Sequence, residues 1–462
     1  MVRVITQDTY DEVVKENIEE FDMSPEEAIK EAIDQFDAQG VDLTNIIKDL
    51  ALGSGDKHLV LTTVEKLKEL CSNNKNDTLI MNELEILKAE CSKDIAHRVM
   101  AGKAGAYNIL IDLLDEKLKM YKHVESEENK QFIVKILNCL VALMEVQPDL
   151  LDKKGVDLID SCLDLQNDEI IISTLKWINE CCTKHEINRQ NLFATNIGKK
   201  LKILLGKNNV QLLCEVLQVI RKFTLDDDIR VEFGKAHEHA RDLGVLLLET
   251  LAGLLKKHTT PPLVSELMWT TSTLLVRHEL CSRADLRAEL MSVLCDNYDN
   301  VVVIQQACKL ITALAGNDDV KRDIVNGGIV PVVVSLLGRH ASNAPASALI
   351  LKCIAALSLR EPNHAKQFLQ SGVIKAIVDC IKIHPNSSQV QKNACWAIRN
   401  LVSRCREYNS QFHELDIEAL LNQTYNKFNK EFGFDVKSAL RDLECDVKFE
   451  EQWTGRGGEI EQ

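Results

Sequence analysis

The sequence predicts an all-α fold, a right-handed superhelical solenoid of about eight to nine helical repeats. Aromatic residues make up 5% of the chain and prolines number 8, and β-branched and aromatic residues form no strand-like blocks. A turn, an apolar segment, a break and a long amphipathic segment begin at Gly328, return 44 residues later at Gly372, and return after another 44 at Asp416. A unit that recurs at this interval is a stacked helical repeat, and no strands are expected.

The first element, residues 1–41, is predicted to be an acidic helical extension or cap. Residues 1–56 hold 15 Asp and Glu against 4 Lys and Arg, a balance of −11, which leaves 55 against 51, or −4, for the remainder. This charge argues against nucleic acid or an anionic membrane as its partner. Ser24, Pro25 and Glu27 predict a capped helix start, and Gly40 its end.

Two amphipathic helices alone are not expected to bury their apolar stripes. We therefore predict that they pack on the open end of the first repeat. The alternative is that this acidic segment occupies the groove in which the solenoid would bind a partner. The repeats are expected over residues 42–445, and residues 446–462 are interpreted as a flexible tail. The repeat turns are predicted at the small or polar residues Gly105, Gly155, Asn196, Asp242, Asp285, Gly328, Gly372 and Asp416.

The order of a short helix, a glycine turn, an apolar helix opening Ile329-Val330-Pro331, and a long helix such as Ala394 to Leu401 resembles an armadillo repeat. Two N-terminal stretches, Ile5 to Tyr10 and Glu16 to Phe21, narrow the resemblance to one branch of that family, together with Gly40 to Leu43. The resemblance implies a fold that binds other proteins along its long helices.

The long helix expected within Gln389 to Cys405 shows which face is available for binding. Val390, Ala394, Ala397 and Leu401 follow the spacing of a core stripe, so the opposite face is expected to be exposed. The resemblance implies that this face lines the concave groove. The predicted groove residues, mapped by their distance from each turn, are Trp177, Arg221, Lys222, Trp269, Lys309, Lys352, Trp396, Arg399 and Asn400.

These residues predict a non-enzymatic scaffold or adaptor that binds an extended acidic or phosphorylated protein segment. An importin-like receptor for basic peptides is the alternative, although only Trp396 and Asn400 form the Trp and Asn pair of such receptors. An enzyme is a further alternative, but the chain contains no GxxxxGK[ST], HExxH, GxGxxG or GxSxG motif. We expect no cofactor, no metal, no direct nucleic-acid or membrane partner, and a cytosolic location compatible with a nuclear pool.

His237 and His239 form the only alternating histidine pair. Residues at this spacing point to different sides of a helix, so a shared metal is not expected. The pair resembles the substrate motif of a protein histidine methyltransferase, which makes that enzyme a possible partner, although Glu238 replaces the small residue that such enzymes favour.

Overall fold

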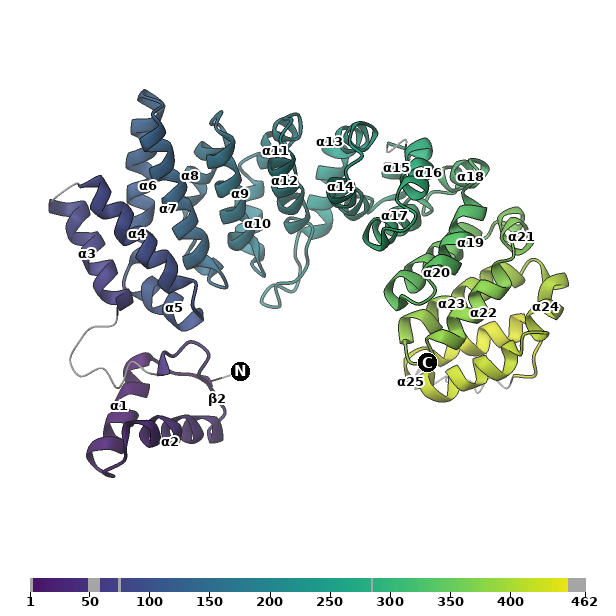
Figure 1. Ribbon diagram of the computed structural model, residues 1–462, viewed down its shortest axis with the longest axis horizontal. Helices are drawn as coiled ribbons and strands as arrows, with labels where there is room; N and C mark the ends of the chain where they lie inside the picture. The colour runs from purple at the N-terminus through teal and green to yellow at the C-terminus, as the bar shows by residue number, and fades with distance from the viewer. Residues whose placement is uncertain (1–2, 49–58, 74–75, 284–285, 448–462) are drawn as a thin grey trace, which may run out of the picture. The chain divides into compact units, whose positions relative to one another are not determined.

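The structure is a computed structural model that describes residues 3–48, 59–73, 76–283 and 286–447. The chain divides into two compact units, Met1–His239 and Ala240–Gln462, and helices dominate both (Figure 1). Within the described ranges, no helix combines the length and the apolar character needed to cross a bilayer. Most of the predicted tail and the predicted turn at Asp285 lie outside the described residues.

The N-terminal helices bury their apolar faces on one another, so our expectation that they could not do so was wrong. Tyr10 and Val14 of one helix meet Ala28, Ala32 and Phe36 of the other in a buried cluster. A short parallel strand pair completes it and corrects the prediction that the chain has no strands. The elements are β1 (Arg3–Val4), α1 (Gln7–Glu19), α2 (Pro25–Ala38) and β2 (Val41–Asp42).

This N-terminal cluster extends beyond the boundary predicted at residue 41. Leu43 and Ile46 are buried in it, and the Gln7 side chain exchanges two hydrogen bonds of 2.8 Å with the backbone of Ile47. The capping box predicted at α2 is present, with Ser24 and Glu27 each accepting from the other's backbone N–H. Docking of this cluster on the first repeat stays a prediction.

The rest of the first unit is a stack of helices. One helix of each repeat contacts its counterparts in the neighbouring repeats, and we call these the stacking helices: α4, α7, α9 and α12 in succession (Figure 1). The elements are α3 (Leu59–Asn73), α4 (Asp77–Cys91), α5 (Ile95–Lys103), α6 (Ala106–His123), α7 (Glu127–Met144), η2 (Pro148–Leu150), α8 (Lys153–Leu163), α9 (Asp168–Cys182), α10 (Glu186–Phe193), α11 (Ile197–Leu205) and α12 (Val210–Lys222).

The second unit repeats this arrangement, with α14, α17, α20, α23 and α25 as its stacking helices. The described residues thus contain nine stacking helices, in agreement with the predicted eight to nine repeats. The elements are α13 (Ala236–Lys257), which begins before the unit boundary, α14 (Pro261–Leu274), α15 (His278–Cys281), α16 (Arg287–Asp296), α17 (Val301–Leu314), α18 (Asp318–Asn326), α19 (Ile329–Arg339), α20 (Ala344–Ser358), α21 (Pro362–Gln370), α22 (Val373–Ile383), α23 (Ser388–Val402), η3 (Arg406–Tyr408), α24 (Asn409–His413) and α25 (Ile417–Asp442).

Most of the predicted repeat turns share one backbone conformation. A residue in the left-handed region, which favours glycine and to a lesser degree Asn and Asp, immediately precedes a helix. It occurs at Gly105, Asn196, Gly328, Gly372 and Asp416, with φ between 59° and 88°. Two predicted turns were wrong: Gly155 lies inside α8, whose N-cap is Asp152, and Asp242 lies inside α13.

We expect Gly372→Ala to lower the free energy of unfolding by about 1–2 kcal/mol, the cost of a left-handed conformation with a Cβ. Gly372 has φ 79° and a Cβ there would meet nothing within 4 Å, so the cost is purely conformational. The matched control is Gly338→Ala inside α19, where the added Cβ also meets nothing within 4 Å and should stabilise by roughly 0.5–1 kcal/mol. Urea unfolding of both variants tests this, and equal effects would contradict it.

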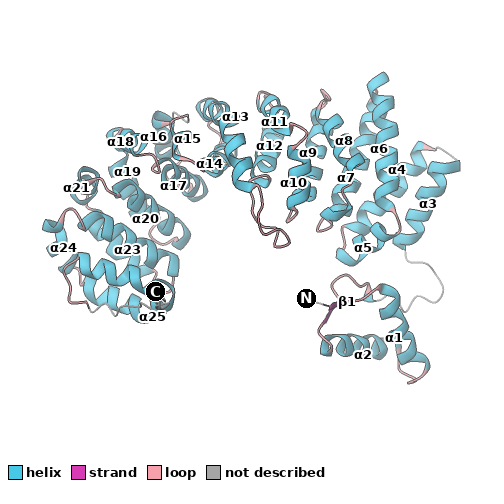
Figure 2. Cartoon of the chain, turned by 180° about the vertical axis from the view of Figure 1, so that it is seen from behind, coloured by secondary structure: helices cyan, strands magenta, loops and turns pink. Residues whose placement is uncertain are grey.

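Residues 223–235 connect α12 to α13 without a helix or strand and appear as a long loop in Figure 2. An ionic network attaches this loop to α10. Asp228 accepts a hydrogen bond of 2.8 Å from the backbone N–H of Glu186, and Arg230 donates to both Asp228 and Asp149 at 2.9 Å. The hydrogen bond from Arg230, with help from the backbone of Glu186, holds the pKa of the Asp228 carboxyl well below its usual range.

A buried arginine lies at the centre of the same network. The Arg189 side chain has no exposed surface, and it donates from Nε to Glu186 at 3.1 Å and from Nη1 to Asp227 at 2.6 Å. Glu186 also accepts a hydrogen bond of 2.7 Å from the backbone N–H of Lys235. The buried guanidinium of Arg189 therefore joins α10 to Asp227 of the loop, and the carboxylate of Glu186 joins α10 to Lys235.

The cysteines are free thiols, and most belong to the core. Burial raises the pKa of Cys162 and Cys182 to about 12, which keeps these thiols protonated. Cys295 is exposed, and Cys71, Cys214 and Cys445 are half-buried. The eleven buried cysteines are Cys91, Cys139, Cys162, Cys181, Cys182, Cys281, Cys308, Cys353, Cys380, Cys395 and Cys405.

Candidate functional site

Eight of the nine stacking helices have similar starts, and this gives them a common register; α25 differs, because its N-cap is the left-handed Asp416, which makes no side-chain cap hydrogen bond. Seven of them follow an Asn or Ser whose side chain accepts from the first backbone N–H groups, while Thr260 followed by Pro261 begins α14. We call the residue nine places after each N-cap the ninth-position residue. These are Glu85, Lys135, Lys176 and Gln218 in the first unit, and Trp269, Lys309, Lys352 and Trp396 in the second.

In the second unit, the ninth-position residues are all among the predicted groove residues. Lysine amines lie close to the two tryptophan rings of this set. Trp269 is exposed, and Lys309 Nζ from the next stacking helix lies 5.8 Å from its ring centroid. Lys392 Nζ lies 5.1 Å from the Trp396 ring. These cation–π contacts hold the amines close to the indoles without neutralising their charge.

A pocket of about 380 Å³ lies between α17, α20 and α23. Trp396, Arg399 and Asn400 line it from α23, and Lys352 from α20, so four of the predicted groove residues meet in one place. The remaining lining residues are Thr312, Ala355, Ala356 and Leu359. Lys352 is exposed, and within the described part of the chain its amine pairs with no carboxylate.

Two residues of this pocket also hold the stack together. Asn400 donates from Nδ2 to the Ala355 carbonyl at 2.8 Å, which satisfies an acceptor near the C-terminus of α20. Arg399 donates from Nη1 to Asp435 at 3.2 Å and lies 3.9 Å from Asp442, so α25 neutralises much of its charge. The free positive charge of this surface comes from the lysines rather than from Arg399.

The first unit does not present the predicted residues in the same way. Trp177 is fully buried, and its Nε1 donates to Met144 Sδ at 2.9 Å, so the expectation that it lines an exposed surface was wrong. Counting from the turn placed it one residue out of register. The ninth-position residue is Lys176, and one step along a helix turns the side chain by about 100° into the core.

Arg221 is also buried, and Lys222 is half-buried with its Nζ 2.9 Å from Thr183 Oγ1. The half-buried cations that sequence reasoning missed are Lys135, Lys176 and Lys392. Lys135 pairs with Glu85 at 3.2 Å and Lys176 lies 3.9 Å from Glu215. Counting from the N-cap residues would have found both lysines of the first unit.

The two histidines of the alternating pair differ in their surroundings. His237 is exposed in the first turn of α13. His239 is buried, with its ring stacked on Phe193 at a centroid distance of 3.9 Å. Methylation of this pair stays a prediction, and only His237 is accessible for it.

Comparison with known proteins tests the predicted family. A family model described as ARMC6 matches residues 60–461, and one described as Armadillo repeat-containing protein 6 N-terminal domain matches residues 2–75. The chain is 42% identical over 462 residues to the Armadillo repeat-containing protein 6 homolog of Drosophila melanogaster, covering 98% of each chain. It is 33% identical over 392 residues to Armadillo repeat-containing protein 6 of Homo sapiens, covering 78% of this chain and 75% of that protein.

Solved structures show the same fold at low identity. An engineered protein aligns with a TM-score of 0.62 and 15% identity over 85% of this chain and 100% of its own. A structure described as "A conserved phosphorylation switch controls the interaction between cadherin and beta-catenin in vitro and in vivo" aligns with a TM-score of 0.56 and 15% identity, covering 82% and 69%. The predicted all-α armadillo solenoid is confirmed, and the chain belongs to the armadillo repeat-containing protein 6 family.

Proposed function

We propose that this protein is a non-enzymatic interaction scaffold that binds an extended acidic or phosphorylated segment of a partner protein along α14, α17, α20 and α23. The observation that carries the proposal is the set of ninth-position residues in the second unit, where the lysines of two successive repeats, Lys309 and Lys352, lie between repeats that present Trp269 and Trp396. A periodic surface of this kind fits a ligand that is itself extended.

Charge favours an acidic ligand over a basic one. Lys309, Lys352 and Lys392 bring three amines to this surface, and none of them forms an ion pair within the described residues. A carboxylate or phosphate that displaces water from an amine gains a charge-assisted hydrogen bond of about 1.5–3 kcal/mol, which salt and solvent reduce. The two tryptophans provide flat apolar contacts of the sort that often dominate binding energy.

The importin-like alternative fits this surface less well. It requires tryptophans and asparagines that hold the stem and backbone of a basic peptide in successive repeats. Here lysines take the tryptophan place on α17 and α20, and the Asn400 amide already donates to Ala355. A basic peptide would therefore meet like charges at two successive repeats.

Charge reversal of the three lysines should abolish most of this binding. We expect K309E/K352E/K392E to weaken binding of a fluorescent octaglutamate peptide by roughly 10- to 100-fold, since each surface pair contributes about 0.5–1 kcal/mol. Fluorescence anisotropy at low and moderate salt measures the affinity, which should also fall as salt rises. A phosphoserine-rich peptide should behave in the same way, whereas octalysine should not bind.

The matched control is K366E/K382E/K430E, which makes the same change in charge at exposed lysines of α21, α22 and α25. Its affinity for octaglutamate should stay close to that of the unchanged protein. Equal affinity in the K309E/K352E/K392E variant, or preference for octalysine, would place the functional surface elsewhere. Tighter binding after removal of residues 1–48 would show that the acidic N-terminal segment competes for the groove.

A further inference from the structure

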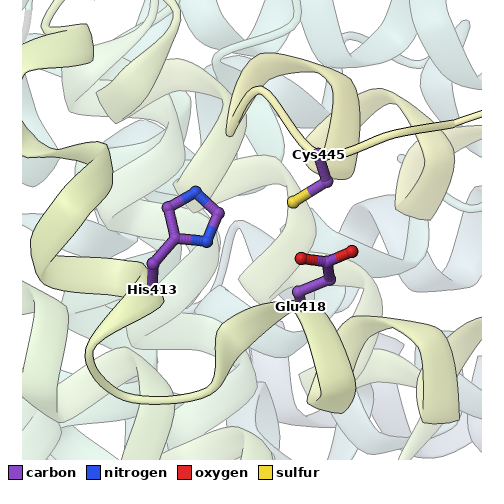
Figure 3. A group of neighbouring side chains, drawn as sticks. All are labelled: His413, Glu418 and Cys445. Atoms are coloured by element: carbon purple, nitrogen blue, oxygen red, sulfur yellow. The ribbon is translucent and has the colours of Figure 1, made fainter.

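Three side chains with metal-ligating atoms meet around α25, and they come from separate parts of the chain (Figure 3). His413 is the last residue of α24, Glu418 lies in the first turn of α25, and Cys445 follows the end of α25. The backbone of α25 is non-helical at Phe428 and Phe432, so this element consists of two helices joined at a bend, and its two ends can lie close together. One ligand atom from each lies within 4.8 Å of the other two. The three side chains point toward one another (Figure 3). His413 and Cys445 are half-buried, and Glu418 is exposed.

Backbone turns fix the positions of Glu418 and Cys445. Asp416, in the left-handed region at φ 59°, begins the helix that carries Glu418. At the other end, Glu444 is left-handed at φ 65° and its N–H donates to the Arg441 carbonyl at 2.9 Å. The N–H of Cys445 donates to the Leu440 carbonyl at 3.0 Å, which completes a Schellman motif and holds the thiol beside the helix end.

A hydrogen bond determines which nitrogen of His413 is available. Nε2 lies 2.9 Å from the Leu443 carbonyl oxygen. Because a carbonyl only accepts, Nε2 carries the proton, and in the neutral ring Nδ1 keeps its lone pair. A histidine that binds a metal through one nitrogen usually donates from the other to a carbonyl or carboxylate, and His413 already has this outer-shell partner.

We propose that His413 Nδ1, Cys445 Sγ and a Glu418 carboxylate oxygen bind one zinc-like divalent cation. Nitrogen, thiolate and carboxylate together suit Zn²⁺, whereas Mg²⁺ and Ca²⁺ prefer oxygen ligands. Bonds of about 2.0–2.3 Å in a tetrahedron place ligand atoms roughly 3.5 Å apart, so the three ligand atoms, which lie within 4.8 Å of one another, need to approach by at most about 1.3 Å.

Water is the expected fourth ligand. The carboxylate of Glu444, next to Cys445 in sequence, is already occupied, because it accepts from Arg406 at 3.2 Å and from Asn409 at 3.3 Å. The exposure of Glu418 leaves the fourth position open to solvent. The bound ion joins the end of α24 to both ends of α25, and it therefore stabilises the last described repeat.

Cobalt(II) titration of the reduced full-length chain tests the site, because thiolate ligation gives a near-ultraviolet charge-transfer band and tetrahedral geometry gives intense visible bands. We expect one equivalent to bind with both features in the unchanged protein. Cys445→Ser should lose the charge-transfer band. His413→Gln should weaken cobalt binding by at least the roughly 10- to 100-fold that loss of an outer-shell partner costs.

Two further variants keep the result interpretable. Glu418→Gln changes an exposed side chain and should retain the charge-transfer band while weakening binding, even if Cys445→Ser does not fold by circular dichroism. Cys295→Ser removes the exposed thiol and should leave the titration unchanged. The proposal is overturned if the unchanged protein shows no thiolate band, if the band persists in a folded Cys445→Ser variant, or if Glu418→Gln binds cobalt as the unchanged protein does.

Discussion

Replacing Trp177 by alanine is expected to lower the free energy of unfolding of the first unit by about 3–5 kcal/mol. The side chain has 0% of its surface exposed and its Nε1 donates to Met144, so truncation leaves a cavity and removes a hydrogen bond. Trp269→Ala is the matched control. That ring is 41% exposed, and its loss should cost about 1 kcal/mol or less in stability.

Urea unfolding followed by circular dichroism measures both variants, and equal midpoints would contradict the assignment of Trp177 to the core. Lys176→Glu tests whether a change in surface charge alone alters stability, because it changes the neighbouring ninth-position residue without altering the core. Its unfolding midpoint should stay near that of the unchanged protein.

Replacing Arg189 by methionine should cost about 3–5 kcal/mol, since removal of one partner leaves the buried carboxylate of Glu186 without a counter-charge. Glu186 is as buried as Arg189, and Asp227 is the second carboxylate that Arg189 contacts. The loss should first release the loop 223–235 from α10, because Asp227 belongs to that loop. Urea unfolding gives the free energy, and limited proteolysis detects release of the loop.

The double variant R189M/E186Q distinguishes an uncompensated charge from lost packing. It should recover part of the stability that R189M loses, because the buried carboxylate is replaced by a neutral amide. Arg322→Met is the surface control. Arg322 is half-exposed and pairs with Asp319 and Glu361, and its loss should cost about 1 kcal/mol or less. Equal losses in R189M and R322M would be incompatible with this interpretation.

The repeats could be predicted from the sequence because local chemistry produces them. Gly105, Gly328 and Gly372 mark left-handed turns that other residues rarely adopt, and the apolar spacing of α23 marks its buried face. The same reasoning failed at Gly155, where the side chain of Asp152 accepts from its N–H and begins the helix three residues earlier. A glycine close to a helix start does not reveal which residue is the N-cap.

The candidate binding surface was predicted only where the repeats are regular. In the second unit, distances from the turns at Gly328 and Gly372 gave Lys352 and Trp396 correctly as ninth-position residues. Trp269 and Lys309 are ninth-position residues as well, although the turn used for Trp269, Asp242, lies inside α13. At Trp177, the count began from a misplaced turn at Gly155 and ended one residue past the ninth position, which is enough to exchange a half-buried side chain for a fully buried one.

Contacts between distant segments could not be predicted from local pattern. The pairing of β1 with β2 joins Arg3 to Val41, and Arg189 meets Asp227 across 38 residues. His413 and Cys445 belong to no spacing that a metal motif would show. Such contacts depend on how helices pack, which is decided by the whole stack rather than by neighbouring residues.

The buried cysteines can report on the local unfolding of individual repeats. Most stacking helices carry one, and a thiol reacts with an alkylating reagent only when it is exposed and ionised. A brief pulse of reagent during unfolding, followed by peptide mapping, would therefore time the opening of each repeat that carries such a cysteine, without any introduced label. These reporters are Cys91 in α4, Cys139 in α7, Cys181 and Cys182 in α9, Cys308 in α17, Cys353 in α20 and Cys395 in α23.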